Sequence, residues 1–364
     1  MGTRPEIIRL SEVIRACDRH FDHVLVHTGQ NWDYTLNEIF FKDLSLRAPD
    51  HYLNVVGADL GETMGNIIAA SYKLMDKERP DALLVLGDTN SALCAIPAKR
   101  LKIPIFHMEA GNRCFDQNVP EEINRKIVDH ISDINLPYTE HSRRYLLSEG
   151  FRKEHIYVTG SPMTEVIAAQ RIKIDASQAL AELQVRKGGY FLVSAHREEN
   201  IDIETKFDEL VGAINGIAET YGKPVIFSTH PRTMKRIEAK GVKFNPLIRN
   251  MKPFSFSDYC RLQLDSYCVL SDSGTLSEES SMLHFPAVLL RNSTERPESL
   301  DVGTIVIGGY KKELLLQAVE LAVSDFDPET RRPWDYEDLN VSAKVVRLIQ
   351  SYTRIIDKVI WDKC

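Results

Sequence analysis

The chain has 364 residues, of which 43% are hydrophobic and 27% charged, a globular profile that excludes low-complexity and disordered classes. Its formal net charge of -7 leaves no basic field to attract a nucleic-acid backbone or an anionic membrane, so an anionic ligand must be held by a few placed arginines. This length is too great for one ordinary core and predicts two domains with a cleft between them.

The chain opens with GTRPEIIRLSEVI at 2–14, which predicts a loop followed by a helix. In an alternating pattern of strands and helices a strand should precede such a loop, so we expect a short hydrophobic strand upstream of Gly2. Arg4 stands before the helix and Arg9 one to two turns into it, where both guanidinium groups could contact an anion. The Gly-x-Arg-Pro pattern is a weak signal by itself.

Short β-branched runs then alternate with helical patterns. They stand at 23–27, 82–87, 103–108, 134–139 and 156–160, and after a lysine- and alanine-rich stretch at 168–187 they resume at 190–196, 224–230, 267–274 and 287–291. This alternation predicts the α/β class, with two parallel sheets covered by helices. We expect an N-terminal domain at 1–167, joined by a C-terminal helix at 343–364 that packs back on it, and a second domain at 168–342.

Most of these strands end in polar or charged residues. Asp88 follows ALLVLG, Glu109 follows IPIFHM and His196 follows YFLVSA. In parallel sheets ligands collect at the carboxyl ends of the strands, and a carboxylate buried there is costly without a task or a partner. We therefore expect Asp88, Glu109 and His196 to form an acid/base set around a bound anion.

A helix is predicted to begin at Pro120, with Glu121 and Glu122 in its first turn. Its apolar stripe is predicted from the isoleucines at 123, 127, 131 and 134. Acidic residues in a first turn commonly just complement the helix dipole. These residues alone therefore leave open whether Glu121 is catalytic or structural.

The segment LSDSGTLSEESSML at 270–283 ends a strand and opens a helix. Three backbone amides of this turn would point at a phosphate beside the positive helix end, those of Ser273, Gly274 and Thr275. In the alternative, Ser273 is an ordinary N-cap and Glu278 and Glu279 lie on the helix surface. Downstream, Arg291 and Arg296 stand in a loop that could fold over the same site.

The six cysteines form no Cys-x-x-Cys pair and stand mostly in apolar runs, which predicts free buried thiols and a cytoplasmic protein. No run approaches the roughly 20 apolar residues of a membrane span, and no signal peptide is visible. The histidines fit no metal spacing such as His-Glu-x-x-His, so we expect no metal.

The motifs together resemble the non-hydrolysing UDP-N-acetylglucosamine 2-epimerases over essentially the whole chain. They are GTRPE (2–6), HTGQ (27–30), GDT (87–89), EAGxR (109–113), PEExNR (120–125), HRxE (196–199), DSG (272–274) and TERPE (294–298). The resemblance implies the GT-B fold, with two Rossmann-like domains facing a central cleft. It also implies a cytoplasmic homodimer that binds a UDP-sugar and uses neither NAD nor a metal.

The resemblance carries functional residues onto this chain position by position. The catalytic residues it implies are Asp88, Glu109, Glu121 and His196. The nucleotide-sugar contacts it implies are Arg4, Arg9, Ser273, Gly274, Glu279 and Arg296, and Tyr259 stands where an aromatic side chain packs on the uracil. The family often has a second glycine where this chain has Thr275, whose amide we also place at the UDP site.

Two segments indicate the substrate. GNRCFDQNVPEEINR at 111–125 and HTGQNWDYTLNEIFF at 27–41 resemble the branch that makes UDP-N-acetyl-L-fucosamine for capsule or O-antigen from UDP-2-acetamido-2,6-dideoxy-L-talose. A site built around the methyl group of this sugar gains little from UDP-N-acetylglucosamine, whose C6 hydroxyl must be desolvated. The alternative is the parent reaction, from UDP-N-acetylglucosamine to UDP-N-acetylmannosamine.

The expected chemistry is an elimination, because C2 of an acetamido sugar is not next to a carbonyl and its proton cannot leave to form an enolate. The proton leaves C2 as UDP leaves C1, giving a 2-acetamidoglycal, and re-addition sets the other configuration. Glu109 and Glu121 would handle the protons, with Asp88 setting their charge state. His196 would meet the diphosphate or relay a proton when the lobes close.

Three other functions share parts of this pattern. A GT-B glycosyltransferase would share the fold and the UDP site but would need an acceptor groove. A hydrolysing epimerase would release free UDP and sugar from the same intermediate. A nucleotide-sugar sensor would bind without turnover.

Overall fold

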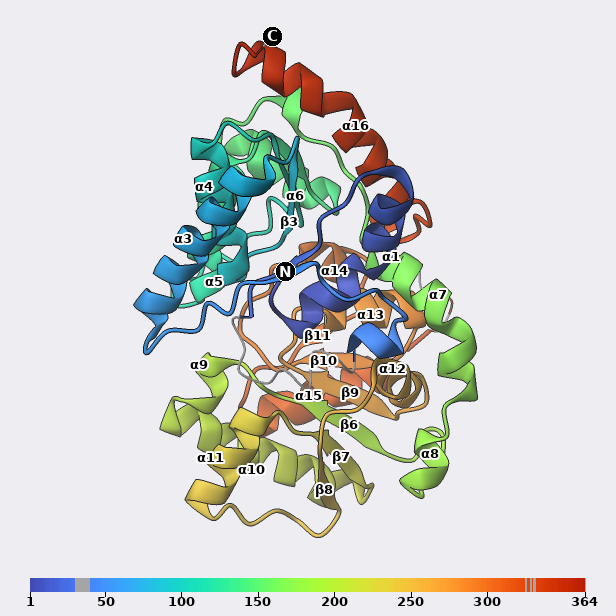
Figure 1. Ribbon diagram of the computed structural model, residues 1–364. Coiled ribbons are helices and arrows are strands. Elements are labelled where there is room, and N and C mark those ends of the chain that lie inside the picture. Colours follow the sequence, from blue (N-terminus) through green and yellow to red (C-terminus); the bar gives the residue numbers. More distant parts are fainter. Residues whose placement is uncertain (30–39, 325, 328, 330–331, 364) are drawn as a thin grey trace. The chain divides into compact units, whose positions relative to one another are not determined.

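The computed structural model describes residues 1–29, 40–324, 326–327, 329 and 332–363. The chain divides into two compact units: unit 1 is Met1–Ala168 with Asp338–Cys364, and unit 2 is Ala169–Glu337. In each unit helices surround parallel strands (Figure 1). The α/β class predicted from the sequence is confirmed, with a Rossmann-like arrangement in both units.

The strands of unit 1 form two separate parallel sheets. One pairs β1 (Val26–His27) with β2 (His51–Tyr52), and the other has the order β3 (Leu83–Leu86), β4 (Ile105–Met108), β5 (Ile134–Leu136). All four residues of β4 are buried, and so are all three of β5. Complete burial of short strands is typical of a sheet covered on both faces.

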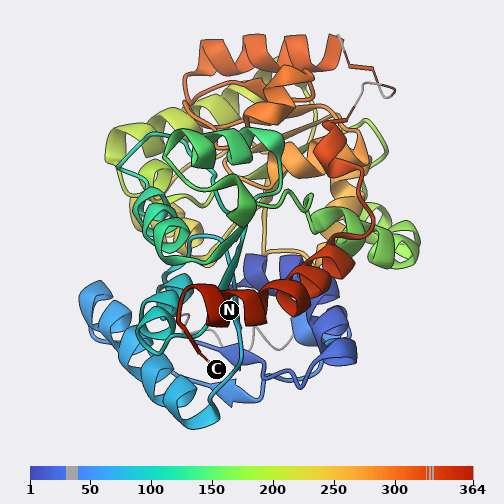
Figure 2. The ribbon, with the colours of Figure 1, turned by 90° about the horizontal axis from the view of Figure 1, so that it is seen from above.

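The helices of unit 1 surround these sheets. They are α1 (Arg4–His20), α3 (Leu60–Glu78), η1 (Asn90–Cys94), α4 (Ala95–Arg100), α5 (Pro120–Ile131), α6 (Glu140–Ser148), η2 (Lys153–His155), the first part of α7 (Met163–Ala176) and α16 (Val341–Val359). The C-terminal helix α16 packs against α1 (Figure 1 and Figure 2). At the start of α1, the Glu6 carboxylate accepts hydrogen bonds from the Gly2 amide at 2.9 Å and the Thr3 hydroxyl at 2.8 Å, which fixes the loop before Arg4.

Unit 2 has one six-stranded parallel sheet with the order β11-β10-β9-β6-β7-β8. Its strands are β6 (Phe191–Ser194), β7 (Val225–Ser228), β8 (Ile248–Met251), β9 (Cys268–Ser271), β10 (Ala287–Leu289) and β11 (Val306–Ile307). The chain runs outward from β6 in one direction and then returns to place β9 on its other side. The strand order therefore reverses between β6 and β9, where ligands bind in sheets of this type.

The helices of unit 2 are α8 (Ala179–Glu182), α9 (Glu198–Ile201), α10 (Glu204–Tyr221), α11 (Pro231–Lys240), α12 (Phe256–Leu264), α13 (Leu276–Leu283), α14 (Pro297–Asp301), α15 (Lys312–Ser324) and η3 (Trp334–Tyr336). α10 packs against α15. Phe191 and Val193 of β6 lie in the same core cluster as Ile214 of α10 and Val319 of α15, all of them fully buried. This core fixes the strands of unit 2, whose carboxyl ends carry the candidate site.

One predicted strand is wrong. Residues 156–160 form no strand, and an isolated bridge joins Ile156 to Asn135 of β5. The Tyr157 amide donates to the Asn135 carbonyl at 3.0 Å, and the Thr159 amide donates to the Pro137 carbonyl at 3.0 Å. Because proline has no N–H to return, the ladder cannot continue at this point.

The cysteines that the structure describes are free thiols, with Cys17, Cys114, Cys260 and Cys268 buried and Cys94 half-buried. Burial raises the pKa of the Cys114 thiol. Among the described residues, no helix combines the length and hydropathy needed to cross a bilayer.

Candidate active site

In unit 1, β3 and β4 end side by side, and the predicted carboxylates follow them. The Gly87 amide donates to the Met108 carbonyl at 2.9 Å, so the residues after both strands lie together. Gly87 has a φ of +67°, and a Cβ built on it would lie 3.2 Å from a Glu109 carboxylate oxygen. A side chain at this position would crowd Glu109, which explains the glycine in the GDT motif.

Glu109 has a left-handed backbone conformation, with a φ of 65°. This conformation costs a non-glycine residue about 1–2 kcal/mol, so the surroundings must hold it. Its side chain is 11% exposed and forms an ion pair with Arg9 of α1, while Asn112 donates to its other oxygen at 3.3 Å. A strained, nearly buried carboxylate against an arginine is the arrangement expected of a functional group.

A buried network behind Glu109 holds this loop. Asp129 of α5 is completely buried, with one oxygen 2.9 Å from His107 Nδ1 and the other 2.8 Å from Arg113 Nη1, and it accepts from the Gly111 amide at 3.2 Å. Burial raises the pKa of Asp129, but the hydrogen bonds and charges of His107 and Arg113 outweigh it and lower the pKa below the ordinary value of 3.8. Asp129 therefore stays ionised and fixes the turn that carries Glu109.

The first turns of α5 lie against the residues after β3. Arg125 donates to one Asp88 oxygen at 3.0 Å and 2.5 Å, and Asn124 donates to the Asp88 carbonyl at 3.0 Å. Glu121 is half-buried in the first turn of the same helix. The structure therefore brings α5, and with it Glu121, to the edge where Asp88 and Glu109 stand.

The predicted apolar stripe of α5 is wrong. Ile123 is 53% exposed and Ile127 37% exposed, and Ile134 lies in β5. The buried residues of α5 are Glu122, Asn124, Arg125, Val128 and Asp129. The buried face of α5 carries charged side chains, and each buried charge needs a partner near the strand ends. These polar contacts decide the orientation of the helix, which leaves Ile123 and Ile127 exposed.

Two other predicted residues of unit 1 lie on α1. Arg9 meets Glu109, as described, and the Arg4 guanidinium lies 4.6 Å from the centre of the Phe40 ring. The motif residue Gln30 and most of the segment HTGQNWDYTLNEIFF, namely residues 30–39, lie outside the described residues.

In unit 2 the predicted histidine stands where the strand order reverses. Asp272 follows β9, is completely buried, and accepts from the amides of His196 at 3.0 Å and Arg197 at 3.0 Å and from Asn200 Nδ2 at 2.8 Å. Burial raises the pKa of Asp272, but the charge and hydrogen bond of His196 and the Arg197 amide outweigh it and lower the pKa. His196 Nδ1 lies 3.2 Å from Asp272 and its side chain is 42% exposed, which directs Nε2 away from the carboxylate.

The turn after Asp272 has a different hydrogen-bond pattern from the one expected. The Ser273 amide donates to the Ser271 hydroxyl at 3.1 Å and the Thr275 amide to the Ser273 hydroxyl at 3.3 Å. Thr275 is the N-cap of α13, without a side-chain cap. The alternative that places Glu278 and Glu279 on the surface is wrong, because both are buried. The turn residues Ser273, Gly274 and Thr275 are half-buried, whereas the residues of α13 that follow them are buried.

The two buried glutamates of α13 have defined partners. Glu278 lies 3.2 Å from Arg296 Nη2, and Glu279 accepts from Gln263 Nε2 at 2.6 Å. Gln263 belongs to α12, on which Tyr259 is half-buried. The structure thus connects the elements that carry the predicted UDP contacts Glu279, Arg296 and Tyr259.

A loop from unit 2 closes on the Ser273 turn. Glu295 accepts from Arg291 at 2.6 Å and from Arg197 at 3.3 Å. A Cβ built on Gly274 would lie 2.4 Å from a Glu295 oxygen. A side chain at 274 would therefore have to displace the Glu295 carboxylate, which Arg291 and Arg197 hold in place.

Sequence reasoning missed the residues that support the site, chiefly Arg113, Arg125, Asp129 and Asp272. Three of them stand inside quoted motifs, Arg113 in EAGxR, Arg125 in PEExNR and Asp272 in DSG, and charged residues next to catalytic positions are the signal that could have found them. Within the described residues, no group of three His, Cys, Asp or Glu side chains is arranged to hold a metal ion.

Comparison with known proteins gives a consistent picture. The pattern that defines the UDP-N-acetylglucosamine 2-epimerase family matches residues 15–350. The structure of UDP-N-acetylglucosamine 2-epimerase from Rickettsia bellii is 45% identical, with a TM-score of 0.91, over 100% of this chain and 98% of its own. That of the Methanocaldococcus jannaschii enzyme in complex with UDP-GlcNAc and UDP is 35% identical, with a TM-score of 0.90, over 96% and 98%. A relative from Pseudomonas aeruginosa, UDP-2,3-diacetamido-2,3-dideoxy-D-glucuronate 2-epimerase, is 32% identical over 89% of this chain and 91% of its own.

Proposed function

The chain belongs to the UDP-N-acetylglucosamine 2-epimerase family, and we propose that it inverts C2 of UDP-N-acetylglucosamine to give UDP-N-acetylmannosamine without hydrolysis. The observation that carries the proposal is the strand-end group of unit 1, where Glu109 pairs with Arg9 and Asp88 with Arg125. The solved relative that holds UDP-GlcNAc supports this choice of sugar. The second candidate is therefore the reaction of the L-fucosamine branch, which gives UDP-N-acetyl-L-fucosamine.

The carboxylates of unit 1 would move the proton at C2. Removal and return of a proton on the two faces of one carbon require two acid/base groups, and we assign these to Glu109 and Glu121. Asp88, held by the Arg125 guanidinium, adds a fixed negative charge beside them.

Unit 2 would hold UDP and stabilise it as it leaves C1. The Ser273–Thr275 turn stands at the point of strand reversal and at the positive end of α13. His196, oriented by Asp272, would donate to the diphosphate or relay a proton. We assign the uracil to Tyr259 on α12, and the remaining nucleotide-sugar contacts to Arg4, Arg9, Glu279 and Arg296.

The segment GNRCFDQNVPEEINR favours the second candidate, UDP-2-acetamido-2,6-dideoxy-L-talose. Cys114 from this segment lies 3.4 Å from Glu122, and Glu122 in turn accepts from Arg125 at 3.0 Å. Cys114 is therefore linked through Glu122 to Arg125, the residue that donates to Asp88. A change at this position could alter which ring the site accepts without changing the chemistry.

Incubation with UDP-N-acetylglucosamine in heavy water is expected to give UDP-N-acetylmannosamine with deuterium at C2, and the recovered substrate should also carry the label. Elimination exchanges the C2 proton with solvent, whereas a sensor would give no product and a hydrolysing enzyme would release UDP. Proton NMR follows both the inversion and the label, and UDP-2-acetamido-2,6-dideoxy-L-talose is run in parallel. Inversion without label at C2 would exclude the elimination route, and a much higher kcat/KM for the talose sugar would establish the second candidate.

Gly274→Ala is expected to lower the affinity for UDP about 10-fold. The new methyl group meets Glu295 at 2.4 Å and must displace it, which strains the turn by roughly 1–3 kcal/mol. Titration calorimetry with UDP measures the change. Gly212→Ala in α10 is the matched control, because a Cβ at 212 has no neighbour within 4 Å. Equal UDP affinities for the two variants would show that UDP does not use this turn.

A further inference from the structure

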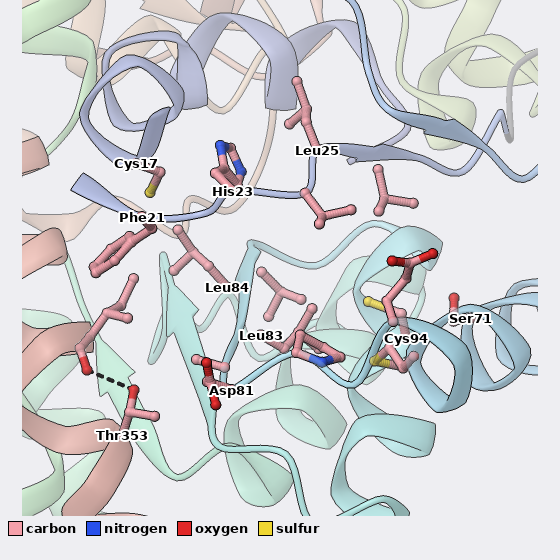
Figure 3. Close-up of a pocket in the computed structure, with 18 of the residues that line it drawn as sticks. Cys17, Phe21, His23, Leu25, Ser71, Asp81, Leu83, Leu84, Cys94 and Thr353 are labelled. Carbon is pink, nitrogen blue, oxygen red and sulfur yellow. Dashed lines mark hydrogen bonds between the residues drawn. The ribbon is translucent and has the colours of Figure 1, made fainter. Parts of the chain in front are cut away.

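Polar groups at the strand ends form the candidate site, whereas the large cavity of unit 1 lies elsewhere in that unit. The cavity has a volume of about 1090 Å³, and Leu25, Leu83 and Leu84 are among the side chains that face it (Figure 3). Asp88 and Glu109 do not line it. A further group that contacts the substrate is therefore expected at a strand end, where ligands of parallel sheets collect.

Unit 2 repeats one short pattern along two neighbouring strands. The pattern is FLVSAH at 191–196 and VIFSTH at 225–230. β6 and β7 pair in parallel, with Val193 opposite Phe227. Continued past the strand ends, this register places His196 opposite His230, and the centres of the two rings lie 6.2 Å apart. The sheet thus brings a second histidine beside the one already assigned to the site.

The local backbone fixes the tautomer of His230. This residue is the N-cap of α11, and its Nδ1 accepts from the Arg232 amide at 3.3 Å. A ring nitrogen that accepts carries no hydrogen, so in the neutral ring the hydrogen is on Nε2. A cap needs only an acceptor, and asparagine or serine would serve at least as well at this position. Histidine adds to the cap an N–H donor on an exposed side chain.

His196 has the opposite tautomer. Its Nδ1 lies 3.2 Å from the buried Asp272 carboxylate, which as an ionised group can only accept. Nδ1 therefore carries the hydrogen, and Nε2 of the neutral ring is an acceptor. The two neighbouring histidines thus present one acceptor and one donor.

A buried contact holds the two histidines in place. The Thr233 side chain, in the first turn of α11, is completely buried, and its hydroxyl donates to the Ala195 carbonyl at 3.0 Å. Ala195 directly precedes His196, so the turn that follows His230 is tied to the neighbouring strand end. A donor that is fixed in advance stabilises developing charge without the cost of reorganisation.

The order of the strands places His230 farther along the nucleotide than His196. The Ser273 turn follows β9, His196 follows β6 and His230 follows β7, and these three strands are adjacent. Tyr259, which we assign to the uracil, lies on α12, and a buried glutamine of that helix bonds to α13 on the β9 side. Because neighbouring strands lie about 4.8 Å apart, a nucleotide that extends from this side reaches His196 first and His230 last.

We propose that His230 donates a hydrogen bond from Nε2 to the terminal phosphate of UDP as the bond between C1 and the phosphate oxygen breaks. The proposal rests on the proposed function and divides its work between two histidines. His230 stabilises the charge on the leaving diphosphate and keeps its own hydrogen. His196, whose Nε2 is an acceptor, is left to relay a proton.

Two substitutions separate the donor from the cap. His230→Asn keeps an acceptor near the place of Nδ1 and removes the donor, whereas His230→Gln places an amide donor near Nε2 and removes the cap. The Asn variant is expected to lower kcat for C2 inversion by about 10²-fold and the affinity for UDP by about 10-fold, because a donor aimed at developing charge is lost. Its affinity for UMP, which lacks the terminal phosphate, should be native, and so should its thermal unfolding.

The Gln variant is expected to show the reverse pattern. Its kcat and its UDP affinity should stay within about threefold of the native values, since the donor is restored. Its midpoint of thermal unfolding should fall by about 2–4 °C, since the cap is lost. Titration calorimetry with UDP and with UMP, NMR of C2 inversion and thermal unfolding measure the four quantities for each variant.

A native ratio of UDP to UMP affinity in the Asn variant would overturn the proposal, and so would native turnover. Equal losses in the Asn and Gln variants would also overturn it, because the cap or the ring itself would then be what matters. UDP and UMP binding are measured without turnover, so this arm does not depend on the sugar. A chain that shows the expected binding pattern but does not invert UDP-N-acetylglucosamine would contradict the proposed function and leave His230 at the diphosphate.

Discussion

Glu109→Gln is expected to lower kcat for C2 inversion by about 10²-fold or more, the usual cost of losing an acid/base group. Glutamine keeps the size of the side chain and can still accept from Arg9 and Asn112, as the carboxylate does. It cannot take up the C2 proton. UDP affinity should change little, because we assign the UDP contacts chiefly to unit 2, so the effect should fall on kcat and not on binding.

Glu121→Gln is expected to show the same loss, and Glu140→Gln is its matched control. Glu140 stands in the first turn of α6 as Glu121 does in α5, and it lies 3.1 Å from Arg143 on the surface. If first-turn glutamates only complement the helix dipole, the two variants will behave alike. Near-normal turnover in Glu109→Gln would reduce that residue to a counter-charge for Arg9.

The positions of the site residues could be predicted because strand ends are visible in the sequence. An apolar run followed by a charged residue predicts where β3, β4 and β6 end, and parallel strands bring these ends to one edge. The catalytic assignments of Asp88, Glu109 and His196 remain predictions, but their positions after the strands agree with the structure. Local pattern and sheet geometry together are sufficient for this step.

The partners of these residues could not be predicted in the same way. Arg125 donates to Asp88, which lies 37 positions away in the chain. Asp129 forms an ion pair with Arg113, and the segment that connects them follows a path that depends on tertiary packing. Hydrophobic periodicity pointed to Ile123 and Ile127 as the buried face of α5, since it takes no account of buried ion pairs. The charged face of α5 is the buried face, whereas hydrophobic periodicity detects only faces made of apolar side chains.

Three strands were missed for a related reason. β2 and β11 have two residues each, and β8 reads Ile-Arg-Asn-Met with an exposed arginine at its second position. β2 and β8 lack the β-branched run that predicts a strand, whereas β11 ends the β-branched run TIVI at 304–307, which the prediction passed over. Each of the three forms because a neighbouring strand pairs with it. β8 and β11 lie at the two ends of the sheet of unit 2, where hydrophobic burial is least.

Asp129→Asn is expected to lower the free energy of unfolding by roughly 3–5 kcal/mol, since it leaves Arg113 buried without its full counter-charge. The folded pKa of Asp129 is lower than its unfolded value, so this stabilisation is present above about pH 4 and is lost as the pH falls through the folded pKa. The difference between the native chain and the variant should therefore shrink in acid. Urea unfolding at several pH values measures it.

The matched control for that variant is Asp175→Asn, which removes an ion pair between Asp175 and Arg171, both exposed on α7. Surface pairs of this kind contribute little, so its unfolding curve should follow that of the native chain. Asp129→Asn should also lose turnover in proportion to the fraction of chains in which the Glu109 turn has moved, because Asp129 holds the Gly111 amide and Arg113, which follow Glu109. An unfolding difference that stays constant from neutral pH into acid would mean that the carboxylate charge of Asp129 is not what holds the turn, and the positioning role would then belong to His107 and Arg113 alone.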